Sequence, residues 1–189
     1  MIELQSILQL QISREGESMR KLLILGAGGY GKTVADLARQ TGDYDRIGFL
    51  DDHAQGHYIL GACEEFMMFS GEDVEMIPAF GNNETRLYWL DRLIASGIKV
   101  PALVHSTAYV SPTVRLKPGT VILPKAILNT DCQVGRGCIV NCGAIADHGC
   151  ILEEAVHLCL GCIVKAENRI PACTKIEAGQ IVDSRTYPL

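Results

Sequence analysis

Two histidines, His148 and His157, lie in a stretch of the C-terminal half that is otherwise rich in aliphatic and small residues. An imidazole titrates near neutral pH, so a well-placed histidine can accept a proton from an attacking amine or hydroxyl group. Asp147 directly precedes His148, but successive residues of a strand point to opposite faces, so we do not expect it to orient the imidazole. Taken alone, these residues leave His148 as either a general base or a solvated surface residue.

A second candidate site begins at Gly26, Gly28 and Gly31, which fit the pattern G-x-G-x-x-G between a predicted strand and a predicted helix. Glycines let the backbone approach phosphate closely, and a helix N-terminus offers free N–H groups to an anion. Polar residues lie at the end of the second predicted strand and just after the third, at the same expected edge of the sheet: Asp51, Asp52, Asn82 and Asn83. This pattern predicts a nucleotide site, with ordinary turn and cap residues as the open alternative.

The N-terminal half alternates predicted strands with predicted helices, which favours a parallel α/β sheet. Strands are expected at 21–25, 45–52 and 75–80, and helices at 32–40 and 84–96. A full dinucleotide-binding fold needs two mononucleotide halves, and this segment is long enough for one. The sequence therefore favours part of a nucleotide-sugar as ligand over NAD, and an NAD-dependent oxidoreductase is the weakest functional alternative.

The C-terminal half repeats every six residues from Ala108 onward. The third residue is Val, Ile or Leu in twelve of thirteen successive hexads, although only 50 of the 189 residues are of these types. The exception is Ala146, in the hexad that contains His148. An unbroken hexapeptide period is typical of a parallel β-helix, in which three hexads form one triangular coil. Twelve full hexads predict about four coils.

Residues 18 apart should stack in adjacent coils, so the sequence can be arranged in columns. The outward second hexad position then forms a column of isoleucines: Ile127, Ile145, Ile163 and Ile181. An aliphatic column is not expected to face water, and we expect it to be an oligomer seam beside His148. In a second column, Asp147 stacks between Asn129 and Lys165, which predicts an ion pair with Lys165.

Composition and charge exclude several classes of function. The net charge is −5 and Lys and Arg do not cluster, so neither nucleic acid nor an anionic membrane is expected as a partner. No apolar stretch is long enough for a membrane helix, and residues 1–18 do not resemble a signal peptide. Eight cysteines without an export signal indicate a reducing cytoplasm, and they lack zinc-ribbon spacing, so no structural metal is expected.

The two halves together resemble bacterial sugar acetyltransferases of the sialic-acid O-acetyltransferase and nucleotide-amino-sugar N-acetyltransferase type. The resemblance covers about residues 20–182 and rests on LLILGAGGYGKTVADLA, FLDD, FGNNETR, LVHSTAYVSPTV and the hexads through DHGCILEEAVHLCLG. It implies a half-Rossmann domain followed by a left-handed parallel β-helix. It further implies acetyl-CoA as acetyl donor and a homotrimer with active sites between neighbouring subunits.

The resemblance also implies roles for single residues. His148 matches the family's general base, His157 matches a histidine near the acetyl-CoA, and the coil backbone near Gly161 would meet the thioester. In the N-acetyltransferases a carboxylate follows the catalytic histidine, whereas this chain has Gly149. Because Gly149 should stack between two acids, we expect Asp131, Glu167 or an acid of the neighbouring subunit to replace that carboxylate.

We expect four segments: a leader (1–18), a nucleotide-sugar-binding domain (19–104), a β-helix (105–182) and a C-terminal tail (183–189). The predicted function is transfer of acetyl from acetyl-CoA to an amino or hydroxyl group of a nucleotide-linked or surface-glycan sugar. Family members continue for several coils after the histidine, whereas five full hexads follow here. The alternative is therefore a catalytically impaired nucleotide-sugar-binding or scaffold protein with a truncated solenoid.

Overall fold

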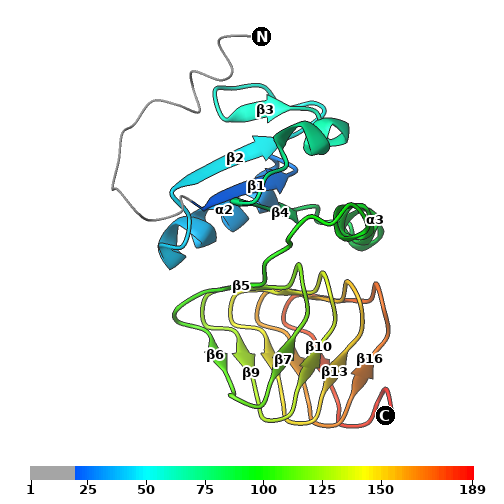
Figure 1. The fold of residues 1–189 in the computed structure, drawn as a ribbon. Helices are drawn as coiled ribbons and strands as arrows, with labels where there is room; N and C mark the ends of the chain where they lie inside the picture. Colours follow the sequence, from blue (N-terminus) through cyan, green and yellow to red (C-terminus); the bar gives the residue numbers. More distant parts are fainter. Residues whose placement is uncertain (1–19) are drawn as a thin grey trace.

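The computed structural model describes residues 20–189, and the predicted leader lies outside the described residues. An α/β domain is followed by a solenoid of short parallel strands, and the domain sits on one side of the solenoid (Figure 1). Within residues 20–189, no helix is both long enough and apolar enough to span a membrane.

The N-terminal domain is a four-stranded parallel sheet with helices on both faces. Its elements are β1 (Lys21–Leu25), α2 (Gly29–Thr41), β2 (Arg46–Leu50), β3 (Ile59–Gly61), the 3-10 helix η1 (Cys63–Phe69), β4 (Val74–Pro78) and α3 (Asn83–Ala95), with strand order β3-β2-β1-β4. The three predicted strands and two predicted helices are confirmed, with small changes at their ends. Strand β3 and the 3-10 helix η1 were not predicted from the sequence.

Burial on both faces explains why the sequence of strand β1 is an unbroken apolar run. Leu22 and Ile24 pack with α2 in one buried cluster, while Leu23 and Leu25 pack in another with Trp89 of α3. Both faces of the strand are therefore covered, and a strand buried on both faces needs no polar residue at alternate positions.

The C-terminal domain contains fourteen two-residue strands. The domain-facing sheet consists of β5 (Leu103–Val104), β8 (Val121–Ile122), β11 (Ile139–Val140), β14 (His157–Leu158) and β17 (Lys175–Ile176). The isoleucine sheet consists of β6 (Tyr109–Val110), β9 (Ile127–Leu128), β12 (Ile145–Ala146), β15 (Ile163–Val164) and β18 (Ile181–Val182). The arginine sheet consists of β7 (Arg115–Leu116), β10 (Gln133–Val134), β13 (Ile151–Leu152) and β16 (Arg169–Ile170).

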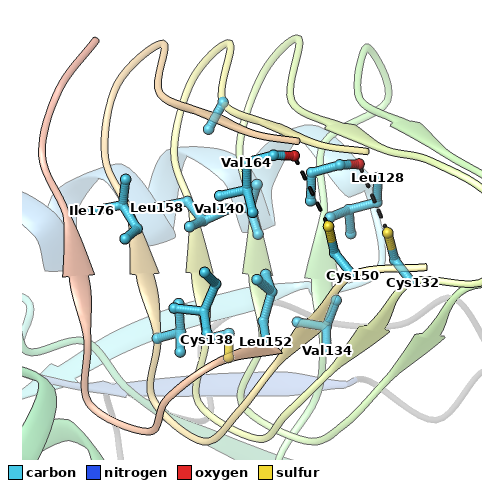
Figure 2. Close-up of a cluster of buried hydrophobic side chains, with 14 of the residues drawn as sticks. Leu128, Cys132, Val134, Cys138, Val140, Cys150, Leu152, Leu158, Val164 and Ile176 are labelled. Atoms are coloured by element: carbon cyan, nitrogen blue, oxygen red, sulfur yellow. Dashed lines mark hydrogen bonds between the residues drawn. The ribbon is translucent and has the colours of Figure 1, made fainter. Parts of the chain in front are cut away.

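The register of these sheets confirms the hexapeptide columns. Ile145 is paired with Ile127 on one side and with Ile163 on the other, and Ile163 is paired with Ile181. The third hexad residues point inward and form the core cluster, part of which is drawn in Figure 2. The first rung begins at β5, slightly before the predicted boundary at residue 105.

The cysteines of the solenoid behave mainly as small buried residues. Cys132, Cys138, Cys150 and Cys162 are fully buried, and all eight cysteines of the chain are free thiols. The Cys132 thiol donates to the Asp147 carbonyl at 3.1 Å, and the Cys150 thiol donates to the Lys165 carbonyl at 3.3 Å. Figure 2 shows these two side chains in neighbouring coils. Cys132 and Cys150 therefore lie inside the solenoid, at the corner whose outer side carries His148.

Candidate active site

The glycine loop between β1 and α2 has a shape that two of its glycines impose. Gly26 has φ of +101°, a conformation that L-residues rarely adopt. A Cβ atom on Gly31 would lie 1.9 Å from the Gly26 carbonyl oxygen, so these two residues must lie in direct backbone contact. A Cβ atom on Gly28 would meet nothing within 4 Å. Gly28 is therefore not required by the fold, and its missing side chain leaves space at the N-terminus of α2.

Asp51 and Asp52 follow β2, as predicted, and their carboxylates hold backbone groups. Asp51 accepts hydrogen bonds from the N–H groups of Ala27 at 2.7 Å, His53 at 2.9 Å and Ala54 at 2.7 Å. Burial raises the pKa of Asp51, but these three backbone donors outweigh burial and leave the pKa below its usual value. Asp52 accepts from the N–H of Cys63 at 2.9 Å. Asp51 thus fixes the glycine loop, and Asp52 fixes the start of η1.

The segment after β4 lies beside the glycine loop. A Cβ atom on Gly26 would lie 3.1 Å from the Ala79 carbonyl oxygen, so the two loops meet at the carboxyl edge of the sheet, as predicted. The Asn82 side chain accepts from the Thr85 N–H at 2.8 Å and caps α3. An open hollow of about 400 Å³ lies between the start of α3 and the solenoid, lined by Gly81, Asn82, Asn83, Glu84, Cys173 and Lys175.

His157 lies on β14, in the sheet that faces the N-terminal domain. Its Nε2 is 3.5 Å from the Asn141 side-chain nitrogen, and its Nδ1 is buried without a hydrogen-bond partner among the described residues. Burial, followed by the nearby charges of Arg86 and Lys175, lowers the pKa of His157 to about 4. The imidazole is therefore neutral at physiological pH and cannot serve there as a cationic contact for phosphate.

This lowered pKa predicts a pH dependence of folding. The pKa of His157 falls from 6.5 to about 4 on folding, so between these pH values only the unfolded chain binds the proton. The free energy of unfolding must therefore decrease as the pH falls through this window. Full linkage would give about 2 kcal/mol between pH 7 and pH 5, and solvent screening of the partly exposed ring lowers this value. His157→Gln should therefore reduce the stability difference between these two pH values by about 1 kcal/mol. Urea unfolding of both proteins at the two pH values tests this, and equal differences would contradict it.

His148 lies at the corner between β12 and β13, with an exposed side chain. Asp147 accepts from the His148 backbone N–H at 2.7 Å and from the Asn129 side chain at 3.1 Å. Its carboxylate therefore binds backbone and Asn129, in line with the prediction that it does not orient its neighbour's imidazole. The predicted Asp147–Lys165 ion pair is wrong, because Lys165 pairs with Asp183 at 2.6 Å, one coil further on.

Gly149 stacks between Asp131 and Glu167, as the columns predict. All three turn the same corner with positive φ, of 69°, 60° and 58° respectively. A Cβ atom on Gly149 would lie 3.6 Å from the Glu167 Cγ. The Glu167 carboxylate pairs with Arg185 at 2.7 Å, whereas the Asp131 carboxylate has no hydrogen bond or ion pair within residues 20–189. Of the two candidate acids, Asp131 is the one whose carboxylate is not already paired.

The two candidate sites lie on different sides of one chain. The nucleotide edge is the sheet edge of the N-terminal domain with the residues predicted to bind a nucleotide: Gly26, Gly28, Gly31, Asp51, Asp52, Asn82 and Asn83. This edge and His157 both adjoin the domain-facing sheet. His148 lies at the corner where the isoleucine and arginine sheets meet, which is the corner of the triangular coil opposite that sheet (Figure 1). Gly161 lies at another corner of the coil, between the domain-facing and isoleucine sheets. Residues 20–189 contain no group of three His, Cys, Asp or Glu side chains suited to a metal ion.

Comparison with known proteins places both domains in one family. The model of the PglD N-terminal domain matches residues 21–93. The acetyltransferase domain of PglB from Neisseria gonorrhoeae FA1090 is 34% identical over 88% of this chain and 83% of its own, with a TM-score of 0.85. The same domain in complex with acetyl coenzyme A aligns at 35% identity over the same shares of both chains, with a TM-score of 0.86.

PerB from Caulobacter crescentus, in complex with CoA and GDP-perosamine, shares the fold. It is 24% identical over 89% of this chain and 91% of its own, with a TM-score of 0.72. The predicted half-Rossmann domain followed by a left-handed parallel β-helix is thereby confirmed. Identity of 34% over most of both chains, together with the matching N-terminal domain, shows that this chain belongs to the PglD and PglB family of hexapeptide-repeat sugar acetyltransferases.

Proposed function

We propose that the protein transfers the acetyl group of acetyl-CoA to an amino group of a nucleotide-linked sugar. The observation that carries this proposal is the match of both domains, in order, to an acetyltransferase domain that binds acetyl coenzyme A. The PerB complex, with CoA and a nucleotide-linked sugar bound together, supports the nucleotide-sugar as acceptor. The eight free thiols fit a reducing compartment, and we place the reaction in the cytoplasm.

The mechanism needs a base, an oriented acceptor and donors for a developing oxyanion. The acceptor amine attacks the thioester carbonyl, and His148 takes the proton that the amine loses. The carbonyl oxygen then carries negative charge, which a free backbone N–H of the coils would stabilise. The Gly161 N–H is not free for this role, because it donates to the Cys142 carbonyl at 3.0 Å. Collapse of this tetrahedral species breaks the carbon–sulfur bond, and the imidazolium of His148 returns the proton to the leaving thiolate. Asp131 is proposed as the carboxylate that orients His148.

The acceptor site is proposed at the nucleotide edge. Gly28 leaves room for phosphate at the N-terminus of α2, while Gly26, Gly31 and Asp51 maintain the loop that presents the free N–H groups. Asn82 borders the adjoining hollow. Because this edge and His148 lie on different sides of one chain, the complete active site combines residues of neighbouring subunits, as in the proposed homotrimer.

The isoleucine column is the proposed contact between subunits, and it gives a direct prediction. Ile145→Asp places a charge in the centre of an aliphatic column and should prevent assembly. Light scattering at micromolar concentration should give three times the chain mass for the wild type and the mass of one chain for the variant. Ile94→Asp, at an exposed isoleucine on α3, is the control and should assemble normally. A wild-type monomer would contradict the proposed assembly.

Calorimetry tests the ligands of this proposal. Titrations of acetyl-CoA, a nucleotide-linked amino sugar and NAD should show binding of the first two and none of NAD. Binding of the amino sugar without binding of acetyl-CoA would instead favour the scaffold function. Binding of NAD alone would overturn both.

A further inference from the structure

Arg86, on the first turn of α3, is fully buried and has no acidic partner among the described residues. Its Nε donates to the Gly137 carbonyl at 2.7 Å, and one terminal nitrogen donates to the Ala155 carbonyl at 2.9 Å and the Asn83 side-chain oxygen at 2.8 Å. The other terminal nitrogen donates to the Phe80 carbonyl at 2.9 Å. A buried cation is costly unless its hydrogen bonds are satisfied, so this guanidinium must keep its contacts with these carbonyl groups.

The two solenoid carbonyls that Arg86 binds, of Gly137 and Ala155, belong to one column of the β-helix. Gly137, Ala155 and Cys173 stack in successive coils and turn the same corner with positive φ. Their N–H groups donate to the preceding coil at 2.8 to 2.9 Å, but within residues 20–189 no backbone N–H donates to their carbonyls. Arg86 satisfies the first two carbonyls, and the Asn83 side-chain nitrogen donates to the third, of Cys173, at 2.8 Å. The segment 83–86 therefore contacts three consecutive coils.

This same segment forms part of the nucleotide edge. Asn82 precedes it, and the Phe80 carbonyl that Arg86 holds belongs to the loop beside Gly26. At the same corner Arg136 pairs with Asp91 of α3, but the two side chains are 30% and 50% exposed, and ion pairs that solvent reaches contribute little. The buried contacts of Arg86 and Asn83 are thus the main polar link that fixes the edge against the solenoid.

We propose that Arg86 and Asn83 are positioning residues for acetyl transfer: they set the nucleotide edge on the corner carbonyls of the β-helix. In this role Asn83 acts through the solenoid and not through contact with the nucleotide. The inference rests on the proposed function. It predicts that loss of these contacts weakens acceptor binding and leaves acetyl-CoA binding to the solenoid unchanged.

Trp89 provides a way to distinguish a displaced domain from an unfolded one. It is the only tryptophan of the chain, lies on α3 one turn after Arg86 and is 7% exposed. Its buried cluster consists of residues of the N-terminal domain alone, and its ring stacks on Phe80 and contacts Phe66. Its emission should therefore stay blue-shifted if the domain separates from the solenoid intact, and shift to the red if the domain unfolds.

The experiment compares Arg86→Met, Arg86→Lys and Asn83→Ala with Arg39→Met, which removes an exposed guanidinium of α2 that pairs with Asp36. Arg86→Met should raise KM for the nucleotide-sugar, and its calorimetric Kd, at least about tenfold, because misplaced binding groups are costly. KM for acetyl-CoA should change less than about twofold. Arg86→Lys keeps the charge and some donors, so it should recover part of the loss. Asn83→Ala should show a smaller loss, and the control none.

Each outcome decides the proposal. If Arg86→Met has red-shifted emission, the domain has unfolded, and Arg86→Lys and Asn83→Ala carry the test at unchanged emission. Equal changes in the constants for both substrates, or none, would overturn the positioning role. If the wild type binds the nucleotide-sugar without releasing thiol, the proposed function fails, while calorimetric Kd values still test the positioning. If the wild type binds no nucleotide-sugar, both fail.

Discussion

Replacing His148 by glutamine should lower kcat for acetyl transfer by about 10² to 10⁴, the usual contribution of a general base. The thermal midpoint should not change, because the His148 side chain is exposed and no contact of its ring stabilises the fold within residues 20–189. KM values for both substrates should stay close to those of the wild type, because proton removal occurs in the transition state and not in the bound complex. Steady-state thiol release measures kcat and the KM of each substrate, and thermal unfolding measures the midpoint.

His57→Gln is the matched control, since His57 is an exposed loop histidine of the N-terminal domain. It should leave kcat unchanged. Activity of the His148 variant within about threefold of wild type would contradict the assignment of the base, since even modest general-base catalysis exceeds this. A companion variant, Asp131→Asn, tests the orienting carboxylate: it should lower kcat less than the loss of His148 does.

Two glycines of the same loop should respond differently to an added methyl group: Gly31→Ala should lose stability, and Gly28→Ala should lose affinity for the ligand. Gly31→Ala forces a Cβ atom into the Gly26 carbonyl, which it would approach to 1.9 Å, so the glycine loop or the start of α2 must move. We expect the free energy of unfolding of the N-terminal domain to fall by roughly 3 kcal/mol. Trp89 emission during urea unfolding reports this change, because Trp89 lies in the core of that domain.

Gly28→Ala is the matched variant. Its Cβ atom meets nothing within 4 Å, and Gly28 has φ of −67°, which alanine adopts readily. Stability should change by less than about 1 kcal/mol, the size of the intrinsic Gly-to-Ala effect. Nucleotide-sugar affinity should fall about tenfold or more, because the methyl group occupies the space proposed for phosphate. Unchanged affinity in calorimetry would show that the ligand does not approach the backbone here.

The parts of the fold that repeat could be predicted from the sequence. A strict period of six fixes which residues point inward, which stack and in which register, so the isoleucine column and the position of Gly149 between two acids followed directly. Strand β3 has three residues and η1 is a 3-10 helix of seven, so both are too short to give a pattern that is recognisable in the sequence.

Contacts between distant segments could not be predicted. In the sequence, Arg86 looks like one more charged residue of an amphipathic helix. In the fold it is completely buried, and its guanidinium donates to the carbonyls of two coils. The Asp147–Lys165 pair failed for a related reason: stacking brings several partners within reach, and Lys165 is taken by Asp183. The sequence indicated the residues that we propose for the chemistry, and the family resemblance implied active sites between subunits. The fold adds that His148 and the proposed nucleotide edge lie on different sides of one chain.

The most direct test of the central claim is thiol release by the purified chain given acetyl-CoA and a nucleotide-linked amino sugar. We expect release of one free thiol per acetylated sugar, dependent on both substrates and lost in the His148 variant. Tight binding of the amino sugar with no thiol release above the rate of acetyl-CoA hydrolysis would contradict it.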